Sequence, residues 1–454
     1  MWAKNEISYM NFNDKRLKNR FLKILEAFGE HPSLSIPESC QSMAETKGAY
    51  RFFANNNIDE QKIINGFSKT TIDRMHQYPK ETTFLFLSDS TNIVLSSHKK
   101  LKRIGVLRNQ KARGLNLHTT MVSTEEELAL GIVHQDCWGR RPEDYGKRKL
   151  RAKLPIEFKE SYRWIESFRK VNDSLTNDYH GIFLADRGAD IYELFLEKRS
   201  ENLDLIIRSN YNRMSIEQEK VFDNLKKKNS SGMMNVTIKR SGTIKERIAN
   251  LEVRFSKEII KAPSNKSQLP SCKINIVSAK EINHNTEIHK PIYWKILTTL
   301  EVNTLEDAIY VVTTYSKRWL IERFHFSLKQ GCKVEELQFE DAEKFNKAIA
   351  AYSIIAWRIM YATYLSRVSP HEPCTKVFND TEWRALFCYF NKTSSEPKQP
   401  PTLREAIIML AKIGGFLGRK SDGNPGMKVI WRGMRTLEGA VEMYRILKKD
   451  VGNG

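Results

Sequence analysis

The first sixty residues repeat apolar positions with the period of amphipathic helices. Asn13 and Asp14 can cap a helix that carries apolar residues on one face and basic residues on the others. A second helical piece is expected after Pro37, and a third opens at Thr46. This basic surface could dock on DNA phosphates or could be an ordinary solvated face, and the segment alone does not decide. The apolar positions are Leu17, Phe21, Ile24, Leu25 and Phe28, and the basic ones are Lys15, Arg16, Lys18, Arg20 and Lys23.

From residue 82 the pattern changes to short apolar runs that are typical of buried strands. FLFLSDS, LNLHTTMV and LALGIVHQ predict three strands, the last two antiparallel across the turn STEEE. A helix is expected at 162–171, and GIFLADRGAD predicts a strand that runs into a helix. LDLIIRS predicts a further strand. This β-β-β-α-β-α-β order fits a mixed sheet with helices on its faces, which is an α/β fold.

The second half of the chain alternates between strand and helix patterns over longer stretches. Residues 214–303 contain NVTIKR, NLEVRF, KINIVS and YWKILTTL, which predict an antiparallel β insertion. Helix is expected from 305 to about 330 and again at 342–367. A linker with SSEPKQPP spans 393–401, and the remainder is mostly helical.

Composition adds size, charge and compartment to this picture. A chain of 454 residues is expected to form two or three domains. The net charge of +20 keeps a protein soluble and attracts polyanions, without deciding whether it binds them. Six cysteines without zinc spacing are expected to be reduced thiols of a cytoplasmic protein. Neither a signal peptide nor an apolar run of membrane-spanning length is evident.

Two acidic residues follow apolar runs in the sheet-forming region. Asp89 comes after FLFLS and Asp186 after GIFLA, so both are expected at or near strand ends. Each alone is better explained as a turn or capping aspartate. Together they match a need of phosphodiester chemistry, in which carboxylates from different elements hold two Mg²⁺ ions about 4 Å apart.

A third acidic residue lies on a predicted helix with a distinct polar face. In YSKRWLIERFHFSLK, four polar residues fall within about 60° of arc at 100° per residue, opposite an apolar stripe. A carboxylate beside cations could hold a metal next to a bound phosphate. The plainer interpretation is a surface face with Glu–Arg pairing. The polar residues are Tyr315, Arg318, Glu322 and Lys329, and the apolar ones are Leu320, Ile321, Phe324 and Leu328.

These motifs resemble those of a known family, the bacterial insertion-sequence DDE transposases that include the transposase of transposon Tn-five. The family signature Y-x2-R-x3-E-x6-K on a helix is matched by Tyr315, Arg318, Glu322 and Lys329. The segment 186–190, DRGAD, resembles the context of the family's second aspartate, and Asp89-Ser90-Thr91 that of the first. SIPESCQSMAETKGAYRFFAN and GGFLGRKSDGNPGMKVIW also look familial, so the resemblance covers nearly the whole chain.

The resemblance implies an RNase H-like mixed-sheet catalytic core with an antiparallel β insertion, flanked by helical domains. The expected domains are 1–62 for binding element ends, 63–368 for catalysis and 369–454 for dimerisation. The implied reaction is cut-and-paste transposition: each element end is hydrolysed, a hairpin forms and is reopened, and the 3′ ends join target DNA. The implied partners are the terminal inverted repeats, target DNA and a second copy in a paired-end complex, without a membrane.

The resemblance also implies roles for single residues. Asp89, Asp186 and Glu322 are expected to be catalytic and to hold Mg²⁺, with Mn²⁺ as a substitute. The residues expected to contact DNA are Tyr315, Arg318, Lys329, Trp294 and Arg208. Trp294 would stack on a base flipped out of the duplex, or would be a core residue of the insertion. At Arg208 the following residues are less basic than the family pattern. The expected location is the bacterial cytoplasm, associated with the nucleoid.

Two other functions remain open at this stage. A decayed transposase could bind element ends and inhibit transposition without cutting, but the presence of all three carboxylates favours an enzyme. A metal-dependent nuclease or resolvase could cut without joining. The additional N-terminal and C-terminal helical segments favour assembly on paired ends over that alternative.

Overall fold

The computed structural model describes residues 2–40, 42–107, 112–141, 154–238, 247–282, 291–420 and 422–451. The chain forms two compact units. The first unit consists of Met1–Gln77, Ser90–Gly146 and Glu322–Gly454, and the second of Tyr78–Asp89 and Lys147–Ile321. The chain therefore passes between the units directly after Asp89 and directly before Glu322.

The second unit contains parallel strands that are buried on both faces. β1 pairs in parallel with β5 in a register that ends at Ser88↔Ala185, and β5 pairs with β6 in a register that ends at Ala185↔Ile207. Strands covered on both faces need continuous apolar runs, which FLFL, GIFL and LII provide. The elements are β1 (Thr83–Val94), η2 (Ile156–Phe158), α7 (Tyr162–Ser174), β5 (His180–Ala185), η3 (Arg187–Ala189), α8 (Tyr192–Leu196) and β6 (Leu203–Arg208).

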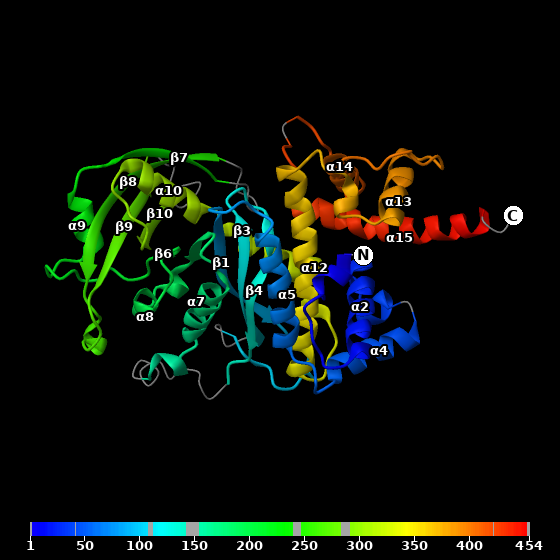
Figure 1. The fold of residues 1–454 in the computed structure, drawn as a ribbon, viewed down its shortest axis with the longest axis horizontal. Helices are drawn as coiled ribbons and strands as arrows, with labels where there is room; N and C mark the ends of the chain where they lie inside the picture. The colour runs from blue at the N-terminus through cyan, green and yellow to red at the C-terminus, as the bar shows by residue number, and fades with distance from the viewer. Residues whose placement is uncertain are drawn as a thin grey trace. The chain divides into compact units, whose positions relative to one another are not determined.

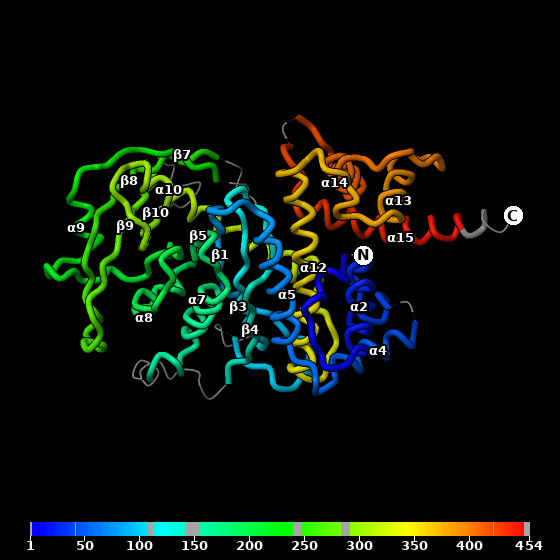
Figure 2. Tube along the Cα trace, in the orientation of Figure 1, coloured from blue at the N-terminus to red at the C-terminus, as the bar shows by residue number. Residues whose placement is uncertain are grey.

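The predicted β insertion is antiparallel, as expected, but its strands continue the same sheet. β10 pairs with β6 on one side and β9 on the other, and β8 and β7 follow in order. α9, which the sequence did not predict, lies beside β8 and β9 (Figure 2). The predicted mixed α/β sheet is confirmed. The elements are α9 (Val221–Lys227), β7 (Gly232–Ile238), β8 (Arg247–Ile260), η4 (Ser264–Lys266), β9 (Cys272–Glu281), β10 (Tyr293–Thr298) and α10 (Leu305–Ser316).

The first unit begins with short helices, several of which start at residues that commonly cap helices. Asp14 caps α2 as predicted, accepting a hydrogen bond from the Arg16 amide at 2.8 Å. Two helices begin earlier than predicted because Ser35 forms a capping box and Ser42 caps α4. The elements are α1 (Trp2–Glu6), α2 (Lys15–Glu30), α3 (Ile36–Ser39), α4 (Met43–Ala54) and α5 (Glu60–Met75).

A β-hairpin and a long central helix complete the core of the first unit. β3 pairs antiparallel with β4 as predicted, and both α5 and α12 pack on β4 (Figure 1). Arg74 of α5 joins these layers, since its guanidinium lies 4.2 Å from the centre of the Trp357 ring and donates to the Leu130 carbonyl at 2.6 Å. The elements are β2 (Gly105–Val106), β3 (Arg113–Thr124), β4 (Ala129–Trp138) and α12 (Ala342–Val368).

α12 differs from the expectation that no segment could span a membrane. Its 27 residues are long and apolar enough by length and composition, with a mean hydropathy of 1.2 over 18 residues. However, 94% of that window is buried inside the protein, against α2, α4, α5 and β4. A helix buried all round is apolar on every face, which is the pattern of a core helix.

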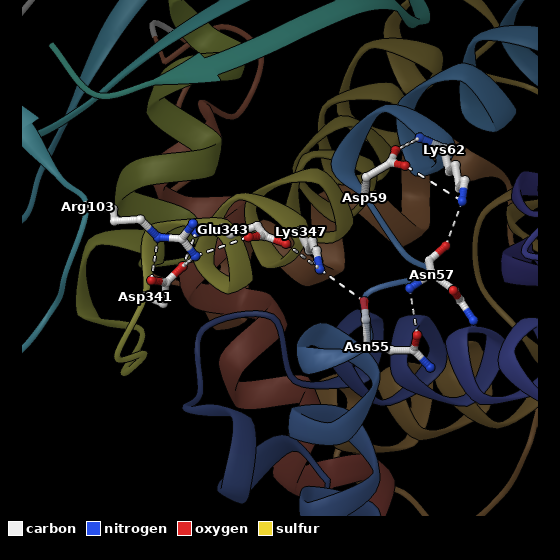
Figure 3. A network of polar contacts seen from close by, with 8 residues as sticks. All are labelled: Asn55, Asn57, Asp59, Lys62, Arg103, Asp341, Glu343 and Lys347. Carbon is white, nitrogen blue, oxygen red and sulfur yellow. Dashed lines mark hydrogen bonds and ion pairs between the residues drawn. The ribbon is translucent and has the colours of Figure 1, made fainter.

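A network of polar contacts fixes the start of α12 to the N-terminal helices (Figure 3). Arg103 donates to Asp341 at 2.7 Å and to Glu343 at 3.1 Å. Glu343 pairs with Lys347 at 3.4 Å, and the Lys347 ammonium donates to the Asn55 carbonyl at 3.0 Å. Lys347 is buried, so the carboxylate and the carbonyl offset the cost of taking its charge out of water.

The C-terminal helices pack closely through glycines. A Cβ at Gly433 would lie 1.8 Å from the Leu410 carbonyl oxygen, and one at Gly414 would lie 1.9 Å from that of Val429. α14 and α15 can therefore approach at this point only without side chains. Further elements of this unit are η6 (Val334–Glu336), η7 (Cys374–Lys376), α13 (Asp380–Asn391), α14 (Leu403–Ile413) and α15 (Met427–Val451).

A buried His–Glu pair links α2 to α15. The His31 Nδ1 and Glu438 Oε2 atoms are 3.8 Å apart, and their side chains are 8% and 10% exposed. The Glu438 carboxylate raises the pKa of His31 against the effect of burial. Burial raises the pKa of Glu438, opposed by His31. Both groups therefore hold protons more tightly in the folded protein than in the unfolded chain.

We predict that this pair makes the first unit less stable as pH rises. Groups whose pKa is raised by folding stabilise at low pH and lose that contribution as pH passes their folded pKa. Between about pH 6 and 8.5 the unfolding temperature should fall by about 2–4 °C or more, as measured by calorimetry. His31→Asn should flatten this slope, whereas the exposed His371→Asn should not. An unchanged slope in His31→Asn would contradict the assignment.

Candidate catalytic site

The strand register brings two predicted carboxylates and one predicted cation into a row. Asp89 follows Ser88, Asp186 follows Ala185 and Arg208 follows Ile207, and these three preceding residues are aligned across β1, β5 and β6. Neighbouring strands are about 4.8 Å apart. The backbones of Asp89 and Asp186 are therefore neighbours, and Arg208 follows in the next strand.

Asp89 differs from the prediction in one respect, because its strand does not end there. β1 continues to Val94, and only the parallel pairing with β5 stops at Ser88. Arg318 Nη1 lies 3.3 Å from Asp89 Oδ2, and the two side chains are 15% and 16% exposed. A largely buried ion pair of this kind offsets the charge of a carboxylate placed beside a second one.

Asp186 is held in a tight turn at the end of β5. Its Oδ1 accepts a hydrogen bond from the Gly188 amide at 2.7 Å and so caps η3. A Cβ at Gly188 would lie 2.9 Å from that same oxygen and 2.9 Å from a ring carbon of Trp164. Glycine is thus required for the carboxylate to fold back on this turn while the indole of α7 packs against it.

Tyr315 lies among the charged groups of this row. It is almost completely buried. Burial raises the pKa of its hydroxyl, Asp186 acts in the same direction, and the guanidinium groups of Arg318 and Arg208 oppose the rise. The sequence predicted Tyr315, Arg318 and Arg208 as a group of DNA contacts, and the structure does bring them together.

Trp294 packs against Tyr315 at the edge of this cluster. The two ring centres are 5.5 Å apart at an interplanar angle of 73°, an edge-to-face contact. Trp294 is half-buried on β10, two residues from Ile296, which pairs with Arg208. The Arg208 Nη2 donates weakly to the Tyr293 carbonyl at 3.5 Å. Its Nε is buried and has no hydrogen-bond partner within the described part of the chain.

The predicted continuous helix from 305 to about 330 is wrong. α10 ends at Ser316, and α11 (Trp319–Phe326) begins after a turn at Lys317 and Arg318. The Arg318 amide donates to the Tyr315 carbonyl at 3.1 Å, three residues back, so the backbone tightens here. The single polar face calculated for Tyr315, Arg318, Glu322 and Lys329 therefore does not exist as such.

Glu322 and Lys329 belong to the first unit. Glu322 is exposed on α11, four residues after Arg318. Lys329 lies in η5 (Ser327–Gly331), a π-helical turn that directly continues α11. Its ammonium donates to the Asn92 carbonyl at 2.8 Å and lies 3.6 Å from a Glu335 oxygen. π-helical turns are frequent at functional sites because they shift the residues that follow a helix.

The sequence did not reveal how the second aspartate of DRGAD acts. Asp190 is buried and forms an ion pair with Arg213. One of its oxygens also accepts hydrogen bonds from the amides of Asn210 and Tyr211, at 2.6 and 2.9 Å. It thereby fixes the loop that follows Arg208. The only signal was its place in the motif, because no periodicity marks a buried aspartate.

A second missed residue is His118 on β3. It is completely buried, and its Nδ1 lies 2.8 Å from the hydroxyl of Ser90, the residue after Asp89. This bond anchors β1 just beyond the carboxylate. The histidine stands in the apolar run LNLHTTMV, where a core position and a hydrogen-bonding position look alike in sequence.

The donor atoms of this site suit a divalent cation. Within the described residues, no three His, Cys, Asp or Glu side chains form a cluster that could hold a metal ion. Asp89 and Asp186 nevertheless present carboxylate oxygens from neighbouring backbones, which are the donors that hard cations take. With Arg318 and Arg208 beside them, the arrangement can hold a cation and an anionic phosphate together.

Comparison with known proteins matches three segments of the chain to family models. Residues 1–58 match a family model described as transposase DNA-binding, residues 164–358 one described as transposase DDE domain, and residues 354–452 one described as transposase Tn5 dimerisation domain. Among solved structures, a chain of a piggyBac transposase synaptic complex with hairpin DNA is similar at 11% identity. The likeness covers 81% of this chain and 73% of that chain, with a TM-score of 0.38.

Proposed function

Because the chain belongs to the Tn5-like DDE transposases and is a DNA transposase, we propose that Asp89, Asp186 and Glu322 are the carboxylates with which it cuts and joins DNA. The observation that carries this proposal is the point where the parallel pairing of β1 and β5 stops, because Asp89 and Asp186 follow the last paired residues and Arg318 forms an ion pair with Asp89. Glu322 enters the proposal through the resemblance of Tyr315, Arg318, Glu322 and Lys329 to the family signature and through its exposure on α11.

DDE domains use divalent metal, and we propose Mg²⁺ with Mn²⁺ as a substitute, because every proposed ligand is a carboxylate. When bound, the metal would polarise the scissile phosphate and supply the charge needed for in-line displacement. Asp89 and Asp186 would hold it. Arg318, which neutralises Asp89 without DNA, would then serve the phosphate, with Tyr315 and Arg208 beside it.

The three sequence domains proposed above divide this work. Residues 1–62 would grip element ends, 63–368 would cut and join, and 369–454 would dimerise; the matches to the three family models, at 1–58, 164–358 and 354–452, follow in the same order. On α2, the basic residues Arg16, Arg20 and Lys23 line a groove of about 370 Å³ with α4. Arg20 lies over Gly48, where a Cβ would meet its Nη1 at 2.0 Å, so glycine allows this approach.

We predict that the proposed carboxylates are needed for cutting but not for binding ends. Asp89→Asn, Asp186→Asn and Glu322→Gln should each slow cleavage by about a thousandfold or more, since metal chemistry supplies several kcal/mol. The measurement is strand nicking and joining, with Mg²⁺, on DNA that carries the element's inverted repeats. Binding to the same DNA is measured by gel shift.

The exposed aspartate variant Asp178→Asn is the matched control and should cut normally. A carboxylate variant that cuts at the wild-type rate would remove that residue from the site. If the wild-type protein binds the repeats but never cuts them, it is a silent end-binding protein derived from a transposase.

We propose further that cleavage proceeds through a hairpin and that Trp294 stabilises it by stacking on an unpaired base. Its half-buried indole, steadied edge-on by Tyr315 near the row of carboxylates, supports this role. A tight hairpin must unpair bases, and an aromatic face lowers that cost.

Trp294→Ala should therefore reduce hairpin yield about tenfold, the value of one stacked base, while the first nick changes little. Denaturing gels of end-labelled DNA separate nicked from hairpin products. Trp294→Phe retains an aromatic face and should recover most of the yield. Hairpins formed by Trp294→Ala at the wild-type rate would show that the indole has no such role.

The family match to a dimerisation domain gives the partner as a second copy, and we propose that α15 forms part of that contact in a paired-end complex. Met443, Ile446 and Leu447 are 56%, 55% and 57% exposed. Their spacing places them on one helical face, which a partner would cover.

Replacing both Ile446 and Leu447 with Glu should convert complexes of two chains and two DNA ends into complexes with one of each. Light scattering after size exclusion measures this stoichiometry. The control is Ile248→Glu, which places a glutamate at an isoleucine that is 68% exposed on β8. Paired-end complexes that survive the double variant would exclude this face.

A further inference from the structure

A groove of about 290 Å³ lies in the first unit, where η5 meets the start of α15. One wall comes from the segment that continues α11, and the other from the first turns of α15. Its chemistry is mixed, with two aromatic rings, two cations and an amide around a glycine. The residues that carry the argument are Phe326, Gln330, Gly331, Lys428, Trp431 and Arg432.

The aromatic rings of this groove are partly exposed to solvent. Phe326 is 38% exposed, although Leu320 and Phe324 on the same helix are completely buried. Trp431 is half-buried and seated on Gly331, where a Cβ would lie 2.8 Å from two carbons of the indole. Only a glycine at position 331 leaves room for the Trp431 indole in the groove.

The charges of the groove favour an anion. Lys428 and Arg432 are exposed and stand one turn apart on α15. Among the described residues that line the groove there is no carboxylate to neutralise them. Two cations on one helical face beside aromatic rings are the combination by which proteins hold the phosphates and bases of unpaired nucleic acid.

The groove is close to a proposed catalytic residue. Phe326 follows Glu322 by four residues of α11, which is about 6 Å along the helix and about 40° around it. Lys329 lies in the same π-helical turn as Gln330 and Gly331. A strand that reaches Glu322 would thus have its next nucleotides within reach of the groove.

We propose that this groove binds an unpaired nucleotide of the DNA strand that is cut, with its base on Phe326 and Trp431 and its phosphate on Lys428 and Arg432. The inference rests on the proposed function, since it needs element-end DNA to reach Glu322. The volume is near the lower end of small-ligand sites and suits one base more than a duplex. Paired bases are stacked on one another and cannot offer their faces to these rings.

The test compares the binding of two DNA duplexes by the full-length protein. Both carry the inverted repeat. One ends flush at the cleavage position, and the other continues there as a four-nucleotide single strand with 2-aminopurine at its first base. Fluorescence anisotropy in EDTA gives both affinities without cutting. The wild-type protein should bind the tailed duplex about tenfold more tightly, and the 2-aminopurine should be quenched on stacking.

Phe326→Ala should bring the affinity ratio close to one and restore the fluorescence, whereas Phe326→Tyr should behave as the wild type. Lys428→Ala combined with Arg432→Ala should lower the ratio and its dependence on salt. The control Phe158→Ala, at another exposed phenylalanine, should leave the ratio unchanged. A ratio unaltered by Phe326→Ala and by the double cation variant would overturn the groove assignment. A wild-type protein that binds neither duplex would instead overturn the proposed function.

Discussion

The parallel pairing of β1, β5 and β6 is the constraint on which the rest of the site depends. Its register places Asp89, Asp186 and Arg208 in one row. Two carboxylates on neighbouring strands repel by a few kcal/mol when both are charged at an effective dielectric of about 20. Three groups offset that repulsion. Arg318 forms an ion pair with Asp89, the Gly188 amide donates a hydrogen bond to Asp186, and the Arg208 guanidinium lies in the next strand. This row also depends on three local features. They are the tight turn at 317–318, the glycine at 188, and the buried Asp190 that fixes the loop after Arg208.

Much of the fold could be predicted because it is local. Runs such as FLFL and GIFL are apolar enough to be buried strands, and Asp14 is a capping residue wherever a helix follows it. The break between α10 and α11 could not be predicted, since YSKRWLIERF contains no helix breaker and the tightening lies only in backbone hydrogen bonds such as Arg318 to Tyr315. The extension of β1 to Val94 has the same origin, because Ser90 is anchored by His118, a residue far along the chain.

In the candidate site too, the local features could be predicted from the sequence and the tertiary contacts could not. The types of residue and their spacing indicated the carboxylates, the cations and the tryptophan. Their association is tertiary: Trp294 reaches Tyr315 only because β10 pairs with β6, so the expected insertion is in fact a continuation of the sheet. In α12 the apolar pattern is clear, but it fits two different structures. It is apolar on all sides since it is covered on all sides, and composition alone cannot distinguish such a helix from one that crosses a membrane.

Charge balance in the proposed site links DNA binding to metal binding. In the second unit, Asp89 and Asp186 carry two negative charges and Arg318 and Arg208 carry two positive ones, so these four groups are neutral together. A phosphate alone would compete with Asp89 for Arg318, and a divalent cation alone would leave an excess positive charge beside two guanidinium groups. Binding both together leaves a smaller excess of positive charge than the cation alone, because the carboxylates can turn to the cation as the guanidinium turns to the phosphate. The overall charge of +20 attracts DNA from a distance. If the proposed assignment is right, the cluster would then bind the scissile phosphate more strongly together with the ion that is needed to cut it.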